Sequence, residues 1–362
     1  MKKILVISNY RGVHTARPEA EIFIGLKKKG YDITIMTYAN AKYIDRFQSE
    51  GIRVIPVHPT KRYDRPFISL LKTELTTESY DIIQLYNNKA ISNGIQAAKN
   101  LPVKIVIYRG ASSNMAWYSP VNYLKFFHPR VDYVICNSEE IRKQFLKVPF
   151  YNKEKAVTIF KGHDTVWYKE TKHHDIRVEL DIPANHLIFV TVANNRGFKA
   201  IPDLIKAMKY LPSDTAITFL IIGKGMDTPQ LRSLTSDSGY QDKIHFLGYR
   251  SDSLNIVAAC DAFVLPSIGG ESLTKSVIEA MSLGVVPIIS DIEGNIPLIE
   301  NMVNGFIFKK ANPRDLADTI MMAYNNRHSL PDFSKAAKLK IDNDINTEKT
   351  VNEYSNFYMK IK

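Results

Sequence analysis

Two glutamates, Glu271 and Glu279, stand in the stretch GGESLTKSVIEAMSLG with seven residues between them. The pattern predicts a helix that begins near residues 272–274 and closes at Gly284, so the two carboxylates flank its first turn. The first amides of a helix have no intrahelical partners, and together with the helix dipole they favour a phosphate or another anion. Glu279 is placed to accept hydrogen bonds from a diol such as a ribose, and Glu271 can do the same for a second polyol.

Other side chains of this helix fit the same chemistry and also a plainer alternative. Thr274 adds a hydroxyl and Lys275 a counter-charge, whereas the apolar positions of the helix are predicted to face the core: Val277, Ala280 and Met281. In the alternative, Lys275 and Glu279 form an ordinary i, i+4 ion pair worth about 0.3–0.5 kcal/mol, and Glu271 is a surface cap residue. Spacing alone leaves both open.

A second cluster lies in VANNRGFKAIPDLIKAM, where Arg196 and Lys199 precede a predicted helix. Two cations at the carboxyl end of a strand suit a diphosphate that becomes a leaving group, although two solvated charges are the alternative. The next glycine turn, in FLIIGKGMDT, has Gly223 and Gly225 but carries Thr228 where a dinucleotide fingerprint has its third glycine. That difference argues against a nicotinamide site.

The elements that must position these residues alternate between strands and helices. Strand-like runs that are apolar almost throughout predict parallel sheets covered on both faces, hence an α/β chain. The alternation breaks at FKGHDTVWYKETKHHD and then restarts. We therefore expect two doubly wound, Rossmann-like domains facing a central cleft: 1–165 with the helix 347–362 packing back on it, and 166–346.

Composition narrows the functional classes. The chain has 362 residues, a formal charge of +11 and two cysteines without metal-ligand spacing. We expect a reduced, cytoplasmic protein with no secretory signal and no membrane-spanning run. The positive charge favours anionic partners: nucleotides, nucleic acid or an acidic membrane surface.

The stretch PSIGGESLTKSVIEAMSLGVVPIISD resembles the Glu-x7-Glu signature of the retaining glycosyltransferases of family four, which have the GT-B fold. The matching frame is a strand, Pro-Ser, a glutamate, seven residues, Glu-Ala-Met, a glycine and another strand. The family commonly has Gly-Phe-Gly-Leu after the first glutamate, where this chain has Ser272, Leu273, Thr274 and Lys275. The resemblance is to enzymes of the bacterial cell-envelope type, and the departure leaves the sugar open.

The resemblance implies roles for individual residues. Glu271 contacts the donor sugar, the amides of residues 272–274 hold sugar and diphosphate, and Glu279 binds the ribose. Arg196 and Lys199 stabilise the leaving group, so the expected catalytic residues are Arg196, Lys199 and Glu271. The expected donor-binding residues are Gly12, Arg109, Gly223, Tyr249, Arg250, Ser272, Leu273, Thr274, Lys275 and Glu279. Acceptor-side candidates are His14, Arg17 and Asn114. Arg109 stands near a position where many members have a histidine, and it either replaces that contact or meets an anionic acceptor.

We expect a glycosyltransferase that moves a sugar from a nucleoside diphosphate sugar to an acceptor hydroxyl of a glycolipid or polysaccharide precursor, such as lipopolysaccharide. The resemblance implies retention of configuration, no essential metal and no cofactor beyond the co-substrate. The aromatic and basic segment MAWYSPVNYLKFFHPR suggests a lipid-linked acceptor or a peripheral position on the inner membrane face, with a core helix as the alternative. The rival functions are a GT-B sugar epimerase or phosphorylase and a basic nucleic-acid-binding protein, for which the sequence has no recognised motif.

Overall fold

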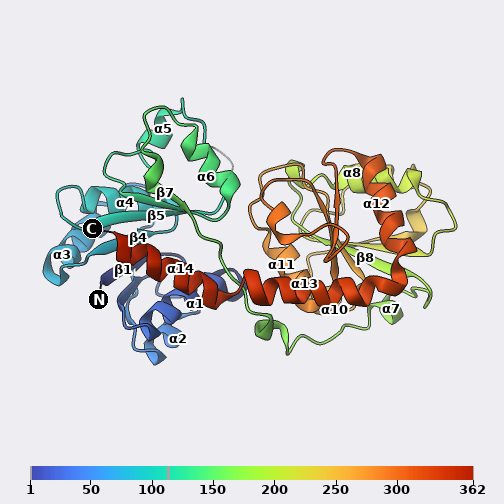
Figure 1. The fold of residues 1–362 in the computed structure, drawn as a ribbon, viewed down its shortest axis with the longest axis horizontal. Helices are drawn as coiled ribbons and strands as arrows, with labels where there is room; N and C mark the ends of the chain where they lie inside the picture. Colours follow the sequence, from blue (N-terminus) through green and yellow to red (C-terminus); the bar gives the residue numbers. More distant parts are fainter. Residues whose placement is uncertain (1, 112–114, 362) are drawn as a thin grey trace. The chain divides into compact units, whose positions relative to one another are not determined.

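The computed structural model describes residues 2–111 and 115–361, apart from the side chains of residues 13–15. Contacts divide the chain into two compact units, Met1–Gly162 with Ile345–Lys362 and His163–Asp344. Each unit has its own parallel sheet with helices packed against it (Figure 1). The predicted α/β class with two Rossmann-like sheets is confirmed. We call the units the N-terminal unit and the C-terminal unit.

Among the described residues, the sheet of the N-terminal unit has seven parallel strands in the order β3-β2-β1-β4-β5-β6-β7. The strands are Lys3–Ile7 (β1), Asp32–Met36 (β2), Arg53–Ile55 (β3), Ile82–Leu85 (β4), Lys104–Arg109 (β5), Tyr133–Cys136 (β6) and Ala156–Thr158 (β7). β1, β4 and β5 are almost wholly buried, as expected of strands covered on both faces. The edge strand β3 is short because Pro56, which follows it, has no N–H to donate to the ladder.

Several helices of this unit begin after residues whose side chains cap them. Asp64, Asn87 and Ser138 each accept a hydrogen bond from a backbone N–H in the first turn of the helix that follows. The helices are Val13–Lys28 (α1), Ile44–Ser49 (α2), Arg65–Glu78 (α3), Asn88–Ala97 (α4), Pro120–Tyr123 (α5), Glu139–Leu146 (α6) and Thr347–Lys360 (α14).

The start of α1 lies earlier than its proline alone suggests. Proline favours the first turn of a helix, but α1 begins at Val13, and the N–H of Ala16 donates to the carbonyl of Gly12 (2.9 Å). Pro18 lies in the second turn, where the helix loses the hydrogen bond that an N–H there would make.

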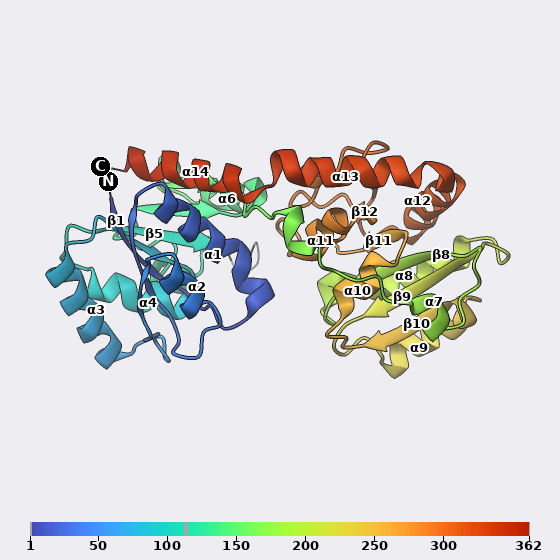
Figure 2. The ribbon, with the colours of Figure 1, turned by 90° about the horizontal axis from the view of Figure 1, so that it is seen from below.

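The C-terminal helix α14 packs on α1, and the two lie side by side in Figures 1 and 2. A side chain at Gly25 would place its Cβ 2.5 Å from Val351 Cγ2, so the glycine lets the two helices approach closely. The final helix thereby completes the core of the N-terminal unit, since Val351, Tyr354 and Tyr358 are buried in it.

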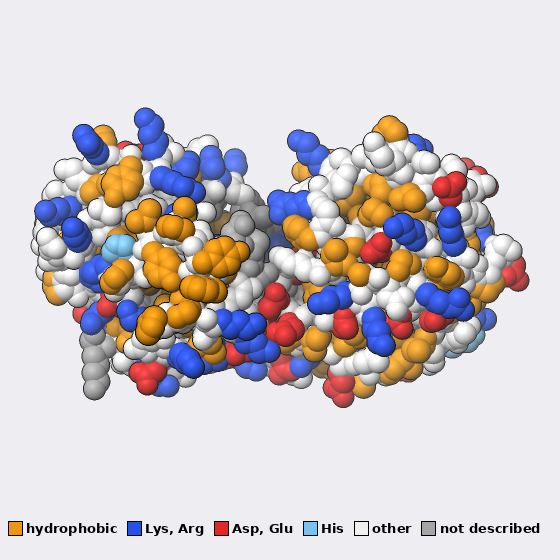
Figure 3. Space-filling view, turned by 90° about the horizontal axis from the view of Figure 1, so that it is seen from above, with side chains coloured by type: hydrophobic (Ala, Val, Ile, Leu, Met, Phe, Trp, Pro, Cys, Tyr) orange, Lys and Arg blue, Asp and Glu red, His pale blue; other side chains and the backbone are white. Residues whose placement is uncertain are grey.

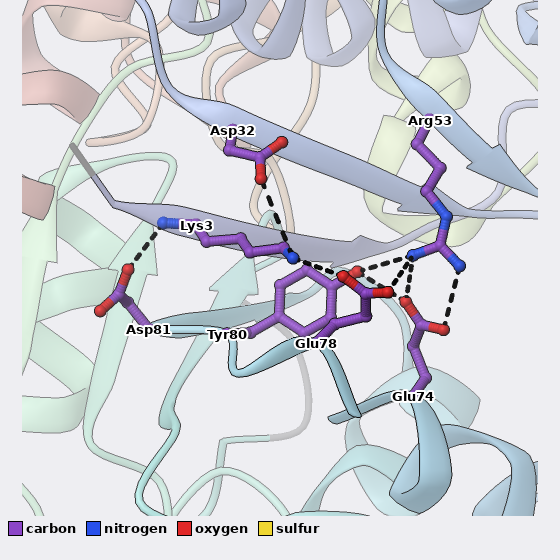
Figure 4. Close-up of polar contacts among 7 residues, drawn as sticks. All are labelled: Lys3, Asp32, Arg53, Glu74, Glu78, Tyr80 and Asp81. Atoms are coloured by element: carbon purple, nitrogen blue, oxygen red, sulfur yellow. Dashed lines mark hydrogen bonds and ion pairs between the residues drawn. The ribbon is translucent and has the colours of Figure 1, made fainter. Parts of the chain in front are cut away.

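The amino-terminal edge of the same sheet is bound to α3 by ion pairs (Figure 4). Lys3 Nζ lies 2.6 Å from Glu78 Oε2, and the two guanidinium nitrogens of Arg53 lie 2.5 and 3.2 Å from the carboxylate oxygens of Glu74. The hydrogen bond and charge of Lys3 lower the pKa of the Glu78 carboxyl group. This edge is held by charge pairing, whereas the longer loops lie at the carboxyl-terminal edge.

The C-terminal unit repeats the topology. Its sheet has six parallel strands within the described residues, in the order β10-β9-β8-β11-β12-β13. The strands are Leu187–Val192 (β8), Ile217–Ile222 (β9), Ile244–Gly248 (β10), Ala262–Leu265 (β11), Val286–Ser290 (β12) and Phe306–Phe308 (β13). The strand order reverses between β8 and β11, and ligands of doubly wound sheets bind outside the carboxyl ends at such a reversal.

The helices of this unit include the predicted helix that closes at Gly284. They are Ile176–Glu179 (α7), Ile201–Ala207 (α8), Pro229–Ser236 (α9), Ser253–Ala258 (α10), Lys275–Leu283 (α11), Pro313–Asn325 (α12) and Leu330–Asp344 (α13). In α11, Val277, Ala280 and Met281 are fully buried, as predicted. Gly284 ends the helix in the left-handed conformation (φ 81°), which confirms the expected stop.

Candidate active site

Two expected catalytic residues meet at the reversal of strand order in the C-terminal unit. Lys199 follows β8 in the short 3-10 turn Gly197–Lys199, and Glu271 follows β11. Because β8 and β11 are neighbours, their loops lie together, and Lys199 Nζ forms an ion pair with Glu271 Oε1. Both side chains are largely buried, with 13% and 12% of their areas exposed. Arg196 lies on the same loop as Lys199 and is exposed to solvent.

The carboxylate of Glu271 has further partners that orient it. Ser267 Oγ donates to Oε1 at 3.0 Å and Thr274 Oγ1 donates to Oε2 at 3.2 Å. Glu271 is therefore not a surface cap residue, because its side chain is largely buried and both of its carboxylate oxygens have partners. A carboxylate offers about four acceptor positions, so further hydroxyl donors can still be accommodated.

Thr274, the residue before α11, is fixed by an asparagine that the sequence pattern did not indicate. Asn295, which is fully buried in the loop after β12, accepts from the N–H of Thr274 (2.8 Å) and donates to Thr274 Oγ1 (2.8 Å). The N–H of Thr274 was expected to help hold a phosphate. To do so, it must give up its hydrogen bond to Asn295 and donate to the phosphate instead. Asn295 lies 21 residues away in sequence, and nothing in the local pattern marks it.

Glu279 lies on α11 and forms the i, i+4 ion pair with Lys275 that was the alternative to a ribose contact. Lys275 Nζ forms an ion pair with Glu279 Oε1, and 13% of the Glu279 side chain is exposed against 35% for Lys275. The i, i+4 pair is therefore real. It leaves room for a diol on the carboxylate, because one ammonium does not fill all its acceptor positions.

Three loop contacts hold the ends of β8, β9 and β11 close together. A Cβ on Gly223, whose φ is 148°, would lie 1.6 Å from the carbonyl oxygen of Ala193, so no other residue fits between β8 and β9 there. Asn195 Nδ2 donates to the carbonyl of Gly225 at 2.8 Å, and Ile268 N–H donates to the carbonyl of Phe198 at 2.8 Å. The loops that carry Arg196, Lys199 and Glu271 are thus connected to one another.

Tyr249 and Arg250, the residues expected near a base, differ in their surroundings. Tyr249 is exposed. The Arg250 guanidinium pairs with Asp252 (2.9 and 2.8 Å) and with Glu179 (2.7 Å). Hydrogen bonds from Arg250 lower the pKa of Asp252 to about 2. Two carboxylates therefore already balance the charge of Arg250.

The remaining expected residues lie in the N-terminal unit or outside the described part. Gly12 precedes α1, and Arg17 lies partly exposed on that helix. The side chain of His14 and the whole of Asn114 lie outside the described residues. Arg109 ends β5, with its guanidinium 4.6 Å from the centre of the Phe126 ring, and burial lowers its pKa.

A buried ion pair lies near these residues. Glu19 on α1 pairs with Lys161 at 3.3 Å, and Lys161 Nζ also lies 4.3 Å from the centre of the Tyr108 ring. Glu19 is thus part of the interior of the N-terminal unit.

Among residues 2–111 and 115–361, no group of three His, Cys, Asp or Glu side chains is arranged to hold a metal ion. Within the same residues, no helix combines the length and the apolar character that crossing a membrane requires.

Comparison with known proteins defines the class. Residues 172–340 match the model of glycosyl transferases group 1, and residues 20–167 match that of Glycosyltransferase Family 4. With its two Rossmann-like units, the chain is a glycosyltransferase of the GT-B fold. It belongs to the group 1 and family 4 glycosyltransferases, whose models together cover both units.

Individual relatives agree with this assignment. The chain is 27% identical over 308 residues to the UDP-Gal:alpha-D-GlcNAc-diphosphoundecaprenol alpha-1,3-galactosyltransferase of Escherichia coli, with 82% of this chain and 79% of that protein covered. It is 26% identical over 339 residues to the N,N'-diacetylbacillosaminyl-diphospho-undecaprenol alpha-1,3-N-acetylgalactosaminyltransferase of Campylobacter jejuni, with 86% and 88% covered. The crystal structure of Anabaena HepE in complex with UDP and glucose has the same fold, with a TM-score of 0.78 at 19% identity over 99% of this chain and all of that chain.

Proposed function

We propose that the chain transfers a sugar from a nucleoside diphosphate sugar to a hydroxyl of a lipid-linked or glycan acceptor, with retention of configuration. The observation that carries the proposal is the Lys199–Glu271 pair at the strand-order reversal of a group 1 glycosyltransferase domain. The C-terminal unit is the donor domain and the N-terminal unit is the acceptor domain. Both curated relatives named above carry a diphosphoundecaprenol-linked substrate in their names, which supports a lipid-linked acceptor.

In this proposal the donor lies across the loops after β8 and β11. Glu271 accepts hydrogen bonds from sugar hydroxyls, and Glu279 accepts them from the ribose. Lys199 turns from Glu271 toward the diphosphate, where it acts with Arg196 and the backbone amides of residues 272–274, just before α11. These groups stabilise the negative charge that grows on the diphosphate as it leaves.

The transfer needs no strong base on the protein, because the leaving group takes up the acceptor proton. The bond from the anomeric carbon to the diphosphate oxygen breaks, and a bond from the same carbon to the acceptor oxygen forms on the same face of the sugar. The acceptor proton passes to the departing diphosphate oxygen, and the nucleoside diphosphate is released. Positive charge from Arg196 and Lys199 takes the place that a bound cation has in other transferases.

We further propose that the enzyme works at the cytoplasmic face of a membrane, where lipid-linked acceptors are embedded. The net charge of +11 and the exposed apolar side chains of residues 117–124 support this position, because basic proteins with apolar contact residues associate with anionic bilayers.

A panel of nucleotide sugars tests the proposal. A donor at a hundred times its Kd stabilises the native state by about 2.7 kcal/mol, which raises the melting temperature of a unit of this size by roughly 5–10 °C. The donor found in this way is then incubated with lipid-linked acceptors, and proton NMR of the product reports the anomeric configuration. Absence of any stabilising nucleotide sugar would contradict the proposal. Release of an isomer without acceptor would indicate an epimerase, and a requirement for inorganic phosphate would indicate a phosphorylase.

A further inference from the structure

A cavity of about 620 Å³ lies within the N-terminal unit at the carboxyl-terminal edge of its sheet. Arg62 comes from the loop between β3 and α3, Asn88 begins α4 after β4, and Arg109 ends β5. The fourth side is the segment around α5, with Asn122 and Lys125. Loops of several strands therefore converge on one cavity at the edge of the sheet where doubly wound proteins bind ligands.

Three of the residues that line this cavity are cations: Arg62, Arg109 and Lys125. Lys125 is 6% exposed, and no hydrogen bond or ion pair of its ammonium is found in residues 2–111 and 115–361. Within the same residues, Arg62 makes no ion pair with an acid. Burial, followed by the charges of Arg62 and Arg109, lowers the pKa of Lys125. The Lys125 side chain is largely buried, and its ammonium is destabilised by the nearby charges of Arg62 and Arg109 unless an anion binds among the three cations.

The charge and size of the cavity favour a diphosphate. Arginine pairs with phosphoryl oxygens in a two-pronged geometry, and a lysine adds a point charge. One phosphoryl group carries at most about two charges, so two phosphoryl groups balance three cations better than one does.

An apolar surface adjoins the cavity. The segment 117–124 exposes Trp117 (51%), Tyr118 (74%), Val121 (44%) and Leu124 (68%), and Tyr118 and Val121 also line the cavity. Figure 3 shows hydrophobic side chains gathered on this face of the N-terminal unit, with Lys and Arg around them.

The segment 117–124, which carries these exposed side chains, is anchored to the folded unit. Phe126 and Phe127, which follow α5, are buried in the core, and Asn122 Nδ2 donates to the carbonyl of Ala116 at 2.9 Å. Exposed apolar patches of this kind on an anchored segment mark binding surfaces.

We propose that this cavity binds the diphosphate of an isoprenoid-linked acceptor, with the phosphoryl groups on Arg62, Arg109 and Lys125 and the first isoprene units on the aromatic side chains of residues 117–124. A nucleoside diphosphate has the same diphosphate but a polar nucleoside, which this apolar surface does not suit. The assignment rests on the proposed function only in that the acceptor is lipid-linked. It names the group by which the acceptor is held.

Binding is measured without turnover. The chain has two tryptophans, Trp117 and Trp167, so the Trp167→Phe variant leaves Trp117 as the only fluorescent indole. Farnesyl diphosphate is titrated into this variant in the presence of an excess of the nucleoside diphosphate of the donor found in the thermal panel, so that the donor site is filled. A blue shift of the fluorescence is expected as the isoprenoid covers the indole.

The matched variants change the charge by the same amount. Arg62→Gln with Lys125→Gln is expected to weaken farnesyl diphosphate binding about ten- to a hundredfold for each hydrogen-bonded charge that is lost. Lys61→Gln with Lys147→Gln, both exposed and outside the cavity, is expected to change it less than twofold. If the double variant does not fold, the same titration is made with Arg62→Gln alone, because Arg62 is exposed and its replacement is not expected to disturb the fold.

Four results would overturn the proposal. The first is that the cavity and control variants bind farnesyl diphosphate equally well. The second and third are that the protein binds farnesol, or inorganic pyrophosphate, as tightly as farnesyl diphosphate. The fourth is that the cavity variant loses affinity for phosphatidylglycerol vesicles by the same factor as for farnesyl diphosphate. The last two would assign the cations to a free diphosphate or to a general membrane surface. Thermal stabilisation by nucleotide sugars is measured on the same proteins. Its absence sinks the proposed function, whereas loss of farnesyl diphosphate binding with donor stabilisation intact sinks only this inference.

Discussion

Replacing Lys199 with alanine separates a catalytic role from a structural one. In the structure its ammonium pairs with Glu271, whose carboxylate also receives hydrogen bonds from Ser267 and Thr274. Removing one partner of a fully buried ion pair costs about 3–5 kcal/mol. Here Glu271 keeps two hydroxyl donors and some solvent contact, so we expect a loss of stability of about 1–2 kcal/mol and a folded protein.

The expected effect on catalysis is larger. Removing one group that stabilises a developing oxyanion lowers kcat about a hundred- to a thousandfold, or about 2.7–4 kcal/mol. We expect kcat for transfer to fall by that factor in Lys199→Ala while the donor KM changes less than tenfold, because the charge develops only as the diphosphate leaves. Initial rates of nucleoside diphosphate release, with the melting temperature measured in parallel, give both quantities.

The control is Lys224→Ala, which removes an exposed cation from the neighbouring loop after β9. It is expected to leave kcat within twofold of the wild type. If Lys199→Ala had unchanged kcat with a verified donor, or lost activity only in proportion to unfolded protein, the leaving-group role would be refuted.

Three further changes have defined outcomes. Glu279→Gln is expected to raise the donor KM about ten- to a hundredfold with a smaller change in kcat, because a charge-assisted hydrogen bond to the ribose is lost. Gly223→Ala is expected to lower the free energy of unfolding by about 3 kcal/mol or more, because the new Cβ overlaps a carbonyl oxygen, whereas Gly225→Ala costs about 1 kcal/mol. His58 is buried, and desolvation lowers its pKa from 6.5 to about 4, so the unfolded chain takes up the proton first and stability falls as the pH drops from 6.5 toward 4. The loss is at most about 3 kcal/mol, and it is absent in His58→Gln.

These three are checked with donor kinetics, urea unfolding at neutral pH, and urea unfolding between pH 4 and 7. An unchanged donor KM in Glu279→Gln would show that Glu279 pairs with Lys275 but does not bind the donor. Equal stability of the two alanine variants at the glycines would contradict the close approach of the β8 and β9 loops. A wild-type stability that falls no more steeply than that of His58→Gln would show that this imidazole accepts a proton in the folded state.

The sequence predicted most where local pattern determines structure. The strands were identified because burial on both faces makes their sequences apolar almost throughout. The helix before Gly284 was placed to within a residue because that glycine marks its end. The start of α1 is not marked in this way, because the proline at residue 18 is typical of a first turn and α1 carries it in the second.

Partners distant in the chain could not be found in this way. Asn295 holds Thr274 across 21 residues, and Glu179 pairs with Arg250 across 71 residues. Such pairs form because the topology brings loop ends together. The sequence indicated Arg109 as an anion contact, but Arg62 joins it only because the loops after β3 and β5 reach the same cavity.

Hydrogen–deuterium exchange with and without saturating nucleoside diphosphate tests the central claim most directly. We predict protection of backbone amides in residues 195–200 and 268–279, because the loops after β8 and β11 hold the diphosphate in this account. Protection confined to other segments, with these two unchanged at a nucleotide concentration that raises the melting temperature, would contradict it.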